Sequence, residues 1–350
     1  MENIIVRAPN WIGDAVMSLP AVAALKALYP GSSLTVLTKT RAVPVFLHNP
    51  DIDSVLEYDD KGRHKGVKGR FTLARELKAL SFDLAVLMQN AFDAAFIAYL
   101  AGIPERVGYA RDLRSALLTK AIAATHEIKK RHQVFYYLNI IKELGGKIPA
   151  DPRPRIYVGR EDADWAEFFI KKNALASSVL VGVAPGASYG PAKRWPVEAY
   201  AEVLSRFSDQ GCIPIIFGGP EDAETCKAVS EKIAGKHLNL AGGVTLRQFM
   251  AILARLGVFI TNDSGPMHIA SALGIATVAI FGSTDPTLTG PLSANSTVLI
   301  KKADCSPCFD RVCSKGHYRC LTSITADEVY EAADSLIKAS KAIVPGDVHG

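Results

Sequence analysis

Residues 4–14 read IIVRAPNWIGD, a short apolar run followed by a glycine-containing turn and an aspartate. The run at Ile4–Val6 has the length and composition of a buried strand, and residues 15–28 after the turn have the pattern of a helix. A buried strand that passes through a tight turn into a helix opens a βαβ unit. This stretch therefore predicts a parallel sheet covered by helices.

The same alternation continues through the first half of the chain, stops at a polar stretch with two prolines (residues 150–155, ADPRPR) and restarts near residue 179. Two prolines disfavour a continuous helix, so this stretch predicts a linker. The strands expected on its two sides are Ile4–Val6, Leu34–Leu37, Val55–Tyr58 and Leu84–Met88, then Val179–Ala184, Ile213–Phe217, Val258–Thr261 and Thr277–Phe281. We therefore expect an α/β protein with two doubly wound, Rossmann-like domains that face each other across a ligand-binding cleft.

Length and composition agree with this organisation. The chain has 350 residues, enough for two domains, with 49% apolar and 21% charged residues. The net charge of +5 is too mild to suggest a nucleic-acid partner. No apolar run approaches the roughly 18 residues of a membrane span, and residues 1–7 lack the features of a signal peptide. We expect a cytoplasmic protein, with peripheral binding to a membrane as a further expectation.

Basic residues are concentrated in the first half of the chain. The densest run contains Lys61, Arg63, Lys65, Lys68 and Arg70, and a smaller group, Arg106, Arg111 and Arg114, follows. Such runs are either solvated loop charge or a binding face for an anionic partner, such as a phosphorylated glycolipid or a membrane surface.

Asp14 follows the first expected strand, near the start of the first helix. An aspartate there can simply cap the helix. It can also act as a general base, since the carboxyl ends of parallel strands are where ligands bind.

A second turn, residues 185–196 (PGASYGPAKRWP), follows the first expected strand of the second domain. Small residues leave backbone N–H groups open to phosphate oxygens, and Lys193 adds a positive charge. The alternative is an ordinary turn with incidental surface charge.

Two further strand ends have related patterns. Residues 261–268 (TNDSGPMH) begin a helix whose free amides suit a diphosphate, although capping explains most of this motif and His268 fits a buried core position. Residues 217–224 (FGGPEDAE) place acidic groups where ribose hydroxyls can bind, although acidic first turns also stabilise helices.

Together these motifs resemble those of the bacterial lipopolysaccharide heptosyltransferases of glycosyltransferase family nine, which have the GT-B fold, and look most like the heptosyltransferase II branch. The resemblance runs from Ile4 to about Ile337. It implies that Asp14 is the catalytic base and that Lys193 binds the donor diphosphate, with Asp222 as the rival of Glu224 for the ribose. The donor-binding residues that it implies are Trp11, Ile12, Gly13, Ser188, Lys193, Glu224, Val244, Leu246, Asp263, Ser264, Gly265 and His268.

The resemblance also implies the reaction. L-glycero-D-manno-heptose would move with inversion from its ADP conjugate to the first heptose of the lipopolysaccharide inner core (heptosyl-Kdo2-lipid A), without a metal or other cofactor. The first domain (1–172) would bind the acceptor through the Lys61–Arg70 run, the second (173–325) would bind ADP-heptose, and a final helix within 326–350 would return to the first domain. The alternatives are a type I or III heptosyltransferase and a non-catalytic nucleotide-sugar-binding protein.

Four cysteines fall within one late segment: Cys305, Cys308, Cys313 and Cys320. Free thiols, a metal site and disulfides are all compatible with this spacing, and we favour the absence of a functional metal. Asp51 and Asp53 form a D-x-D sequence, which we interpret as surface charge.

Overall fold

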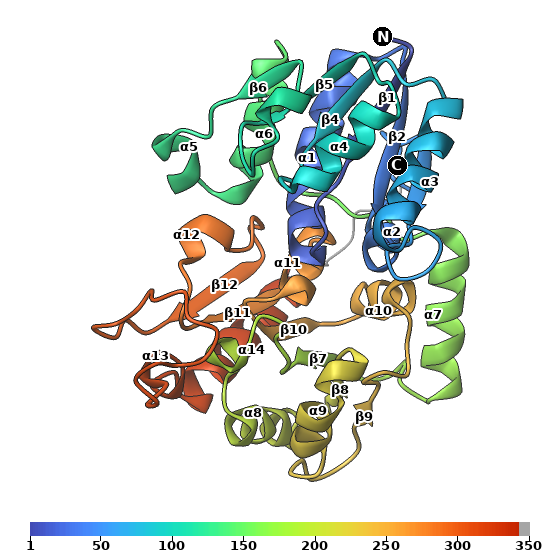
Figure 1. The fold of residues 1–350 in the computed structure, drawn as a ribbon. Coiled ribbons are helices and arrows are strands. Elements are labelled where there is room, and N and C mark those ends of the chain that lie inside the picture. Colours follow the sequence, from blue (N-terminus) through green and yellow to red (C-terminus); the bar gives the residue numbers. More distant parts are fainter. Residues whose placement is uncertain (343–350) are drawn as a thin grey trace. The chain divides into compact units, whose positions relative to one another are not determined.

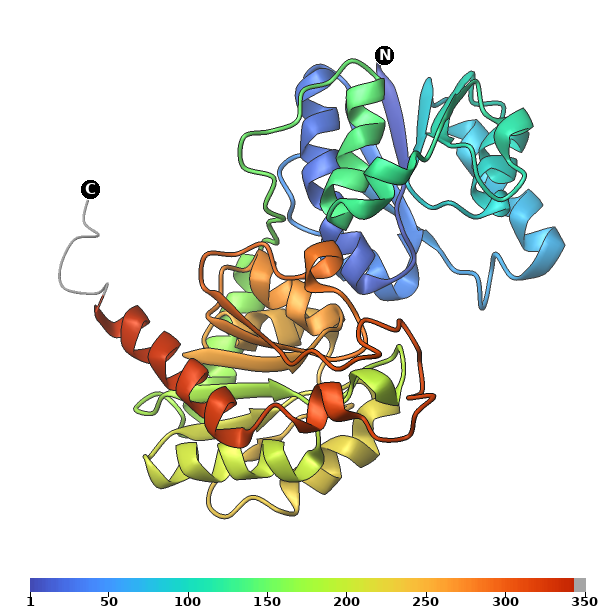
Figure 2. The same ribbon diagram turned by 90° about the vertical axis from the view of Figure 1, so that its left-hand side faces the viewer.

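The structure, a computed structural model, describes residues 1–342. The chain divides into two compact units, Met1–Tyr157 and a second that begins at Val158. Each unit contains one six-stranded parallel sheet with helices on both faces (Figures 1 and 2). The predicted pair of doubly wound α/β domains is confirmed.

The first sheet has the strand order β3-β2-β1-β4-β5-β6. Its strands are β1 (Asn3–Arg7), β2 (Ser33–Lys39), β3 (Ser54–Tyr58), β4 (Leu84–Leu87), β5 (Glu105–Tyr109) and β6 (Lys120–Ile122). The helices of this unit are α1 (Ile12–Leu28), α2 (Val43–Phe46), α3 (Gly66–Ala79), α4 (Phe92–Leu100), α5 (His126–Lys130) and α6 (Gln133–Glu143). Helices α1 and α6 pack together, and α3 and α4 cover the other face of the sheet (Figure 2). Ile4, Ile5 and Val6 are all buried because both faces of β1 are covered, which explains the unbroken apolar run.

The second sheet has the equivalent order β12-β11-β10-β7-β8-β9. Its strands are β7 (Leu180–Ala184), β8 (Ile213–Ile216), β9 (Leu238–Asn239), β10 (Val258–Asn262), β11 (Thr277–Phe281) and β12 (Ser296–Ile300). The helices of this unit are α7 (Arg160–Lys172), α8 (Val197–Asp209), α9 (Ala223–Ser230), α10 (Leu246–Leu253), α11 (Gly265–Ala272), α12 (Pro286–Thr289), α13 (Arg319–Thr322) and α14 (Ala326–Ala342).

In both sheets the direction in which successive strands are added reverses at the centre. The first strand of each unit lies in the middle, and the chain builds outward on one side before it crosses to the other. The reversal falls between β1 and β4 in the first sheet and between β7 and β10 in the second. In open α/β sheets ligands bind beyond the carboxyl ends of the strands at this switch point.

The boundary between the units differs from the sequence-based prediction. The sequence predicts that α7 closes the first domain, but α7 packs against α10, and Asp162 forms an ion pair with Arg247 (Oδ2–Nη2 2.5 Å). This partly buried pair joins α7 to the second unit, so the break comes before the helix. The described part of α14 packs on α8 and β10. Its return to the first domain stays a prediction, and residues 343–350 lie outside the described residues.

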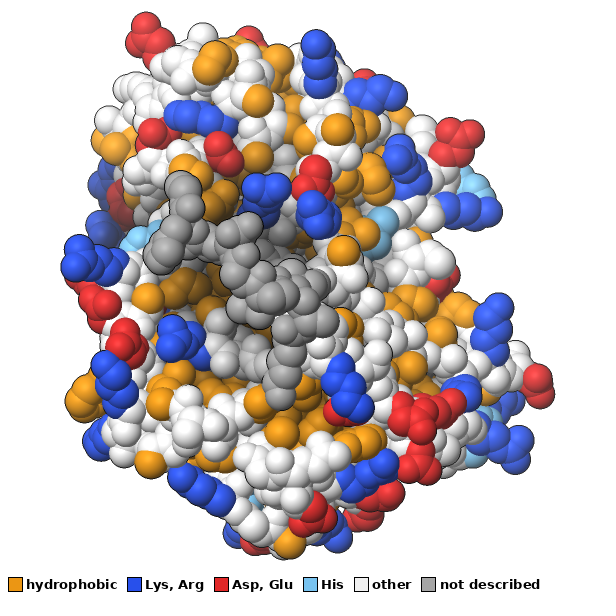
Figure 3. All heavy atoms as spheres, turned by 180° about the vertical axis from the view of Figure 1, so that it is seen from behind, with side chains coloured by type: hydrophobic (Ala, Val, Ile, Leu, Met, Phe, Trp, Pro, Cys, Tyr) orange, Lys and Arg blue, Asp and Glu red, His pale blue; other side chains and the backbone are white. Residues whose placement is uncertain are grey.

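No helix within residues 1–342 is long and apolar enough to cross a membrane. On the face drawn in Figure 3, acidic, basic and apolar side chains are intermingled.

Candidate active site

Asp14 lies in the first turn of α1, just beyond the carboxyl end of β1. It is not the capping residue, because the N-cap position is occupied by Trp11. The Asp14 Oδ1 atom accepts a 2.9 Å hydrogen bond from the hydroxyl of Tyr137 on α6. Burial, followed by the charge of Asp14, raises the pKa of Tyr137 well above its usual value, so this hydroxyl stays protonated and orients the carboxylate. Ile12 and Gly13 beside it are partly exposed.

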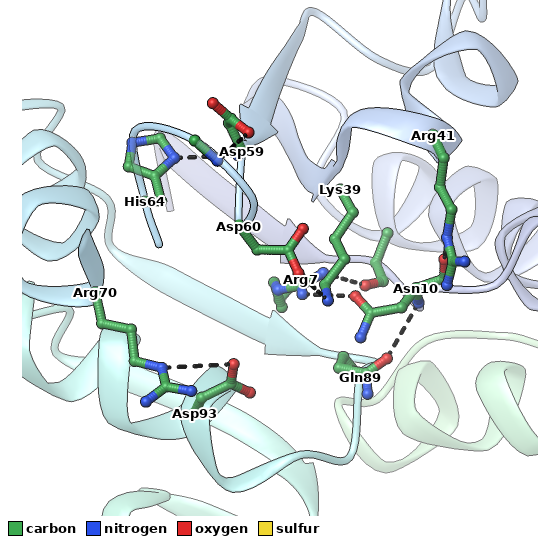
Figure 4. A network of polar contacts seen from close by, with 12 residues as sticks. Arg7, Asn10, Lys39, Arg41, Asp59, Asp60, His64, Arg70, Gln89 and Asp93 are labelled. Carbon is green, nitrogen blue, oxygen red and sulfur yellow. Dashed lines mark hydrogen bonds and ion pairs between the residues drawn. The ribbon is translucent and has the colours of Figure 1, made fainter. Parts of the chain in front are cut away.

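The turn before Asp14 is fixed by groups from three strand ends (Figure 4). The Asn10 amide N–H donates to Gln89 Oε1 (3.2 Å), which follows β4 across the switch point. The Asn10 side-chain oxygen accepts from Arg7 (2.8 Å) and its carbonyl accepts from Arg41 Nε (2.9 Å). The Arg41 guanidinium also lies 4.5 Å from the centroid of the exposed Trp11 ring. The backbone that leads to Asp14 is therefore held in place before any ligand binds.

At the second switch point Lys193 and Asp263 form an ion pair. Lys193 ends a short turn in the loop after β7, and Asp263 follows β10. Lys193 Nζ lies 2.5 Å from Asp263 Oδ2, and the same oxygen accepts a 2.6 Å hydrogen bond from Thr284. Asp263 is only 4% exposed, whereas Lys193 is partly exposed and lies over the ring of Tyr189 (4.6 Å). A buried carboxylate thus fixes a cation at the edge where an anionic ligand is expected.

Asn262 connects the two loops of this second site. Its side-chain oxygen accepts from the Trp195 amide and the Tyr200 hydroxyl, both at 3.1 Å, and its side-chain nitrogen donates to the Pro185 carbonyl (2.8 Å). The residue is fully buried. Asn262 lies in the motif 261–268 but is not among the predicted site residues, although an amide at the end of an apolar strand is a signal that a buried hydrogen-bond network is present.

Two glycines allow the loop after β7 to pass close to its neighbours. A Cβ atom on Gly186 would lie 2.1 Å from the carboxyl carbon of Asp222, and one on Gly190 would lie 2.4 Å from the Arg311 carbonyl oxygen. Gly190 also has φ +149°, which favours glycine. Asp222 therefore faces this loop, and burial raises its pKa, whereas Glu224 is exposed in the first turn of α9.

The remaining predicted donor residues lie around the same edge. Ser264 and Gly265 begin α11 and are partly exposed, and Ser188 is exposed in the loop after β7. His268 is buried within α11, as a core histidine would be. Val244 and Leu246 flank Thr245, which caps α10. Contacts between these residues and a ligand stay predictions.

Comparison with known proteins identifies the family. The profile of glycosyltransferase family 9 (heptosyltransferase) matches residues 70–319. The chain belongs to this family. It is 29% identical to lipooligosaccharide heptosyltransferase 2 of Haemophilus influenzae, over 96% of this chain and 99% of that protein. It is 27% identical to lipopolysaccharide heptosyltransferase 2 of Escherichia coli, over 97% of this chain and 100% of that protein. The structure of E. coli ADP-heptose lps heptosyltransferase II covers 97% of this chain and 100% of its own, with a TM-score of 0.81 and 26% identity. The protein is therefore a glycosyltransferase with the GT-B fold.

The basic run of this glycosyltransferase lies in the loop after β3 and at the start of α3. Lys61, Arg63, Lys65 and Lys68 are exposed, whereas Arg70 is partly buried. Two of these residues already have acidic partners, since Arg63 pairs with Glu76 (2.6 Å) and Arg70 lies 4.0 Å from Asp93 (Figure 4).

A metal site is not evident in the described residues. No three His, Cys, Asp or Glu side chains within residues 1–342 are grouped so that they could hold a metal ion. The four clustered cysteines are free thiols. Asp53 of the D-x-D sequence accepts hydrogen bonds from the Leu34 amide (2.7 Å) and Lys26 (2.8 Å), so it has a structural role at the amino end of the sheet.

Proposed function

We propose that this glycosyltransferase moves L-glycero-D-manno-heptose from ADP-heptose to the first heptose of the lipopolysaccharide inner core. The names of its relatives support a heptosyltransferase that acts on lipopolysaccharide. The motifs of the chain resemble most those of the type II enzyme. One observation carries the proposal: the switch point of the first sheet has a carboxylate, Asp14, oriented by a hydrogen bond, and that of the second sheet has a cation, Lys193, oriented by an ion pair.

The proposed mechanism is a single displacement with inversion. Asp14 takes the proton of the acceptor hydroxyl, and the hydroxyl oxygen forms a bond to the anomeric carbon. The bond from that carbon to the diphosphate oxygen breaks, and its electron pair leaves with ADP. Lys193 and the backbone amides of Ser264 and Gly265 stabilise the negative charge that develops on the leaving group.

The remaining predictions form part of the proposal. Trp11, Ile12 and Gly13 contact the sugar, and the other predicted residues contact ADP. The Lys61–Arg70 run attracts the phosphates and carboxylates of the acceptor, at the inner surface of the inner membrane. If the double variant Lys65→Gln/Lys68→Gln left the acceptor KM unchanged, the run would have no such role.

The test of the function is an assay of purified protein with ADP-heptose and a series of truncated lipopolysaccharides, in which ADP release is followed. We expect turnover only with the acceptor that ends in one inner-core heptose. Turnover with an acceptor that lacks heptose, or only with one that already carries two, would assign the protein to another type. Binding of ADP without turnover on any acceptor would favour a non-catalytic nucleotide-sugar-binding protein.

A further inference from the structure

Helix α3 has an exposed face of which only Lys68 belongs to the predicted acceptor-binding run. Residues three, four and seven positions apart lie on the same side of a helix. One such stripe of α3 is exposed and combines basic with apolar side chains: Val67, Lys68, Phe71, Arg75 and Lys78. The opposite side of the helix, with Leu73 and Leu77, packs in the core of the first unit.

Helix α4 lies beside α3 and continues this face with aromatic residues. Phe92 and Phe96 are stacked with centroids 5.8 Å apart, and Phe96 contacts Phe71 of α3 edge-on at 6.3 Å. Phe71 is 51% exposed and Phe92 is 47% exposed. A contiguous group of aromatic rings left in water on two adjacent helices indicates a surface that binds something.

The charge of this α3–α4 face identifies the kind of partner. The nearby carboxylates are already engaged, because Asp93 lies against Arg70 and Glu76 pairs with Arg63. No ion pair among the described residues involves Lys68, Arg75 or Lys78. The face therefore offers uncompensated positive charge around an aromatic centre, which complements an anionic lipid surface.

We propose that the α3–α4 face binds anionic lipid bilayers. Phe71 and Phe92 enter the boundary between head groups and acyl chains, where aromatic rings are favoured, and Lys68, Arg75 and Lys78 contact lipid phosphates. The inference rests on the proposed function in one respect: the proposed acceptor is anchored in a membrane. The predicted acceptor-binding run leads directly into α3, so one surface would hold the enzyme where its acceptor is concentrated.

Sedimentation of the full chain with lipid vesicles tests the proposal. We expect binding to vesicles of phosphatidylcholine mixed with phosphatidylglycerol, little binding to pure phosphatidylcholine, and weaker binding as salt rises. The variants Phe71→Ser/Phe92→Ser and Arg75→Gln/Lys78→Gln should each lower the vesicle partition coefficient on the order of tenfold. The matched control is Phe168→Ser, because Phe168 on α7 is 63% exposed and also lies near a cation, Lys172.

Activity separates this inference from the proposed function. Both double variants should keep wild-type turnover with a deacylated, water-soluble acceptor and lose turnover with the same acceptor embedded in vesicles. Vesicle binding without turnover on any acceptor would leave the lipid surface standing and remove the proposed function. Vesicle binding that neither double variant weakens, or variants that alter only self-association of the protein, would overturn the inference. Thermal unfolding of each variant shows that the fold is intact.

Discussion

The carboxyl edges of the two sheets have the same topology and opposite chemistry. At the β1/β4 switch point a carboxylate, Asp14, receives a hydrogen bond from the neutral phenol of Tyr137. At the β7/β10 switch point a buried carboxylate, Asp263, holds the cation Lys193. One architecture thus orients an acceptor of protons in one unit and a stabiliser of negative charge in the other. The difference lies in one or two side chains at each edge, and it can be tested at those positions.

The largest effect is expected at the first edge. Asp14→Asn keeps the shape of the side chain and its bond to Tyr137 but removes the base, so kcat should fall by about 10²–10⁴-fold while ADP affinity stays unchanged. Steady-state kinetics and ADP titration calorimetry measure the two quantities. Full turnover in this variant would mean that another group takes the proton, and the contrast between the two edges would lose its chemical meaning.

At the second edge we expect a substitution to change ADP affinity and the free energy of unfolding, the two properties that Asp14→Asn should leave unchanged. Lys193→Met removes the positive charge and should weaken ADP binding by roughly 10–100-fold, as expected for a lost charge-assisted hydrogen bond. It also leaves Asp263 buried without its cation, at a cost of about 3 kcal/mol in the free energy of unfolding.

The double variant Lys193→Met/Asp263→Asn separates these two effects. Without a buried carboxylate, most of the lost stability should return, but ADP binding should remain weak. Recovery of ADP binding in the double variant would show that Lys193 only neutralises Asp263 and does not contact the diphosphate. Chemical denaturation and calorimetry on the same samples provide both measurements.

A smaller effect is expected for the residue that orients the base. Tyr137→Phe removes the hydrogen bond to Asp14 and should lower kcat about tenfold with unchanged ADP affinity, since a bond to a charged group contributes on the order of 1.5–3 kcal/mol. The raised pKa of Tyr137 predicts that wild-type activity shows no alkaline loss from this group below about pH 10. A change in ADP affinity instead of kcat would show that Tyr137 supports the fold of the unit and not the base.

The sequence was sufficient to predict the two α/β domains and to place the candidate functional residues at the carboxyl ends of the strands. Buried parallel strands are continuous apolar runs, so eight of the strands could be located from composition alone. Four strands were missed, and three of them lack this signal: β5 begins with Glu105 and Arg106, β6 has only three residues, and β9 contains only Leu238 and Asn239. The fourth, β12, ends in the apolar residues 298–300, but it is only partly buried. Their place in the sheets depends on pairing with neighbours, which a local pattern does not contain.

The hydrogen-bond partners that come from distant parts of the chain could not be predicted from the sequence. Tyr137 lies 123 residues from Asp14, and nothing in α6 marks it as the donor. Arg114 appears in the sequence as one more surface charge, yet it is fully buried, where it donates to the carbonyls of Tyr109 and Gln89. Spacing along the chain identifies residues at strand ends, whereas the direction of each side chain is set by packing between distant helices and strands.

Asp53 provides the control with the smallest effect, because it is a carboxylate at the opposite end of the first sheet. The Leu34 amide, followed by Lys26, lowers the pKa of Asp53 below its usual value. A lowered carboxyl pKa stabilises the fold at pH values above the unfolded pKa of about 3.9, and the stabilisation is lost as the pH falls through the folded value. Because the side chain is half exposed, Asp53→Asn should cost only about 1 kcal/mol at neutral pH, and the difference from wild type should shrink below about pH 4. Urea unfolding at several pH values measures this, and kcat should not change. A loss of turnover comparable to that of Asp14→Asn would show that any carboxylate removed from the first unit impairs the enzyme, and position at the switch point would no longer explain the role of Asp14.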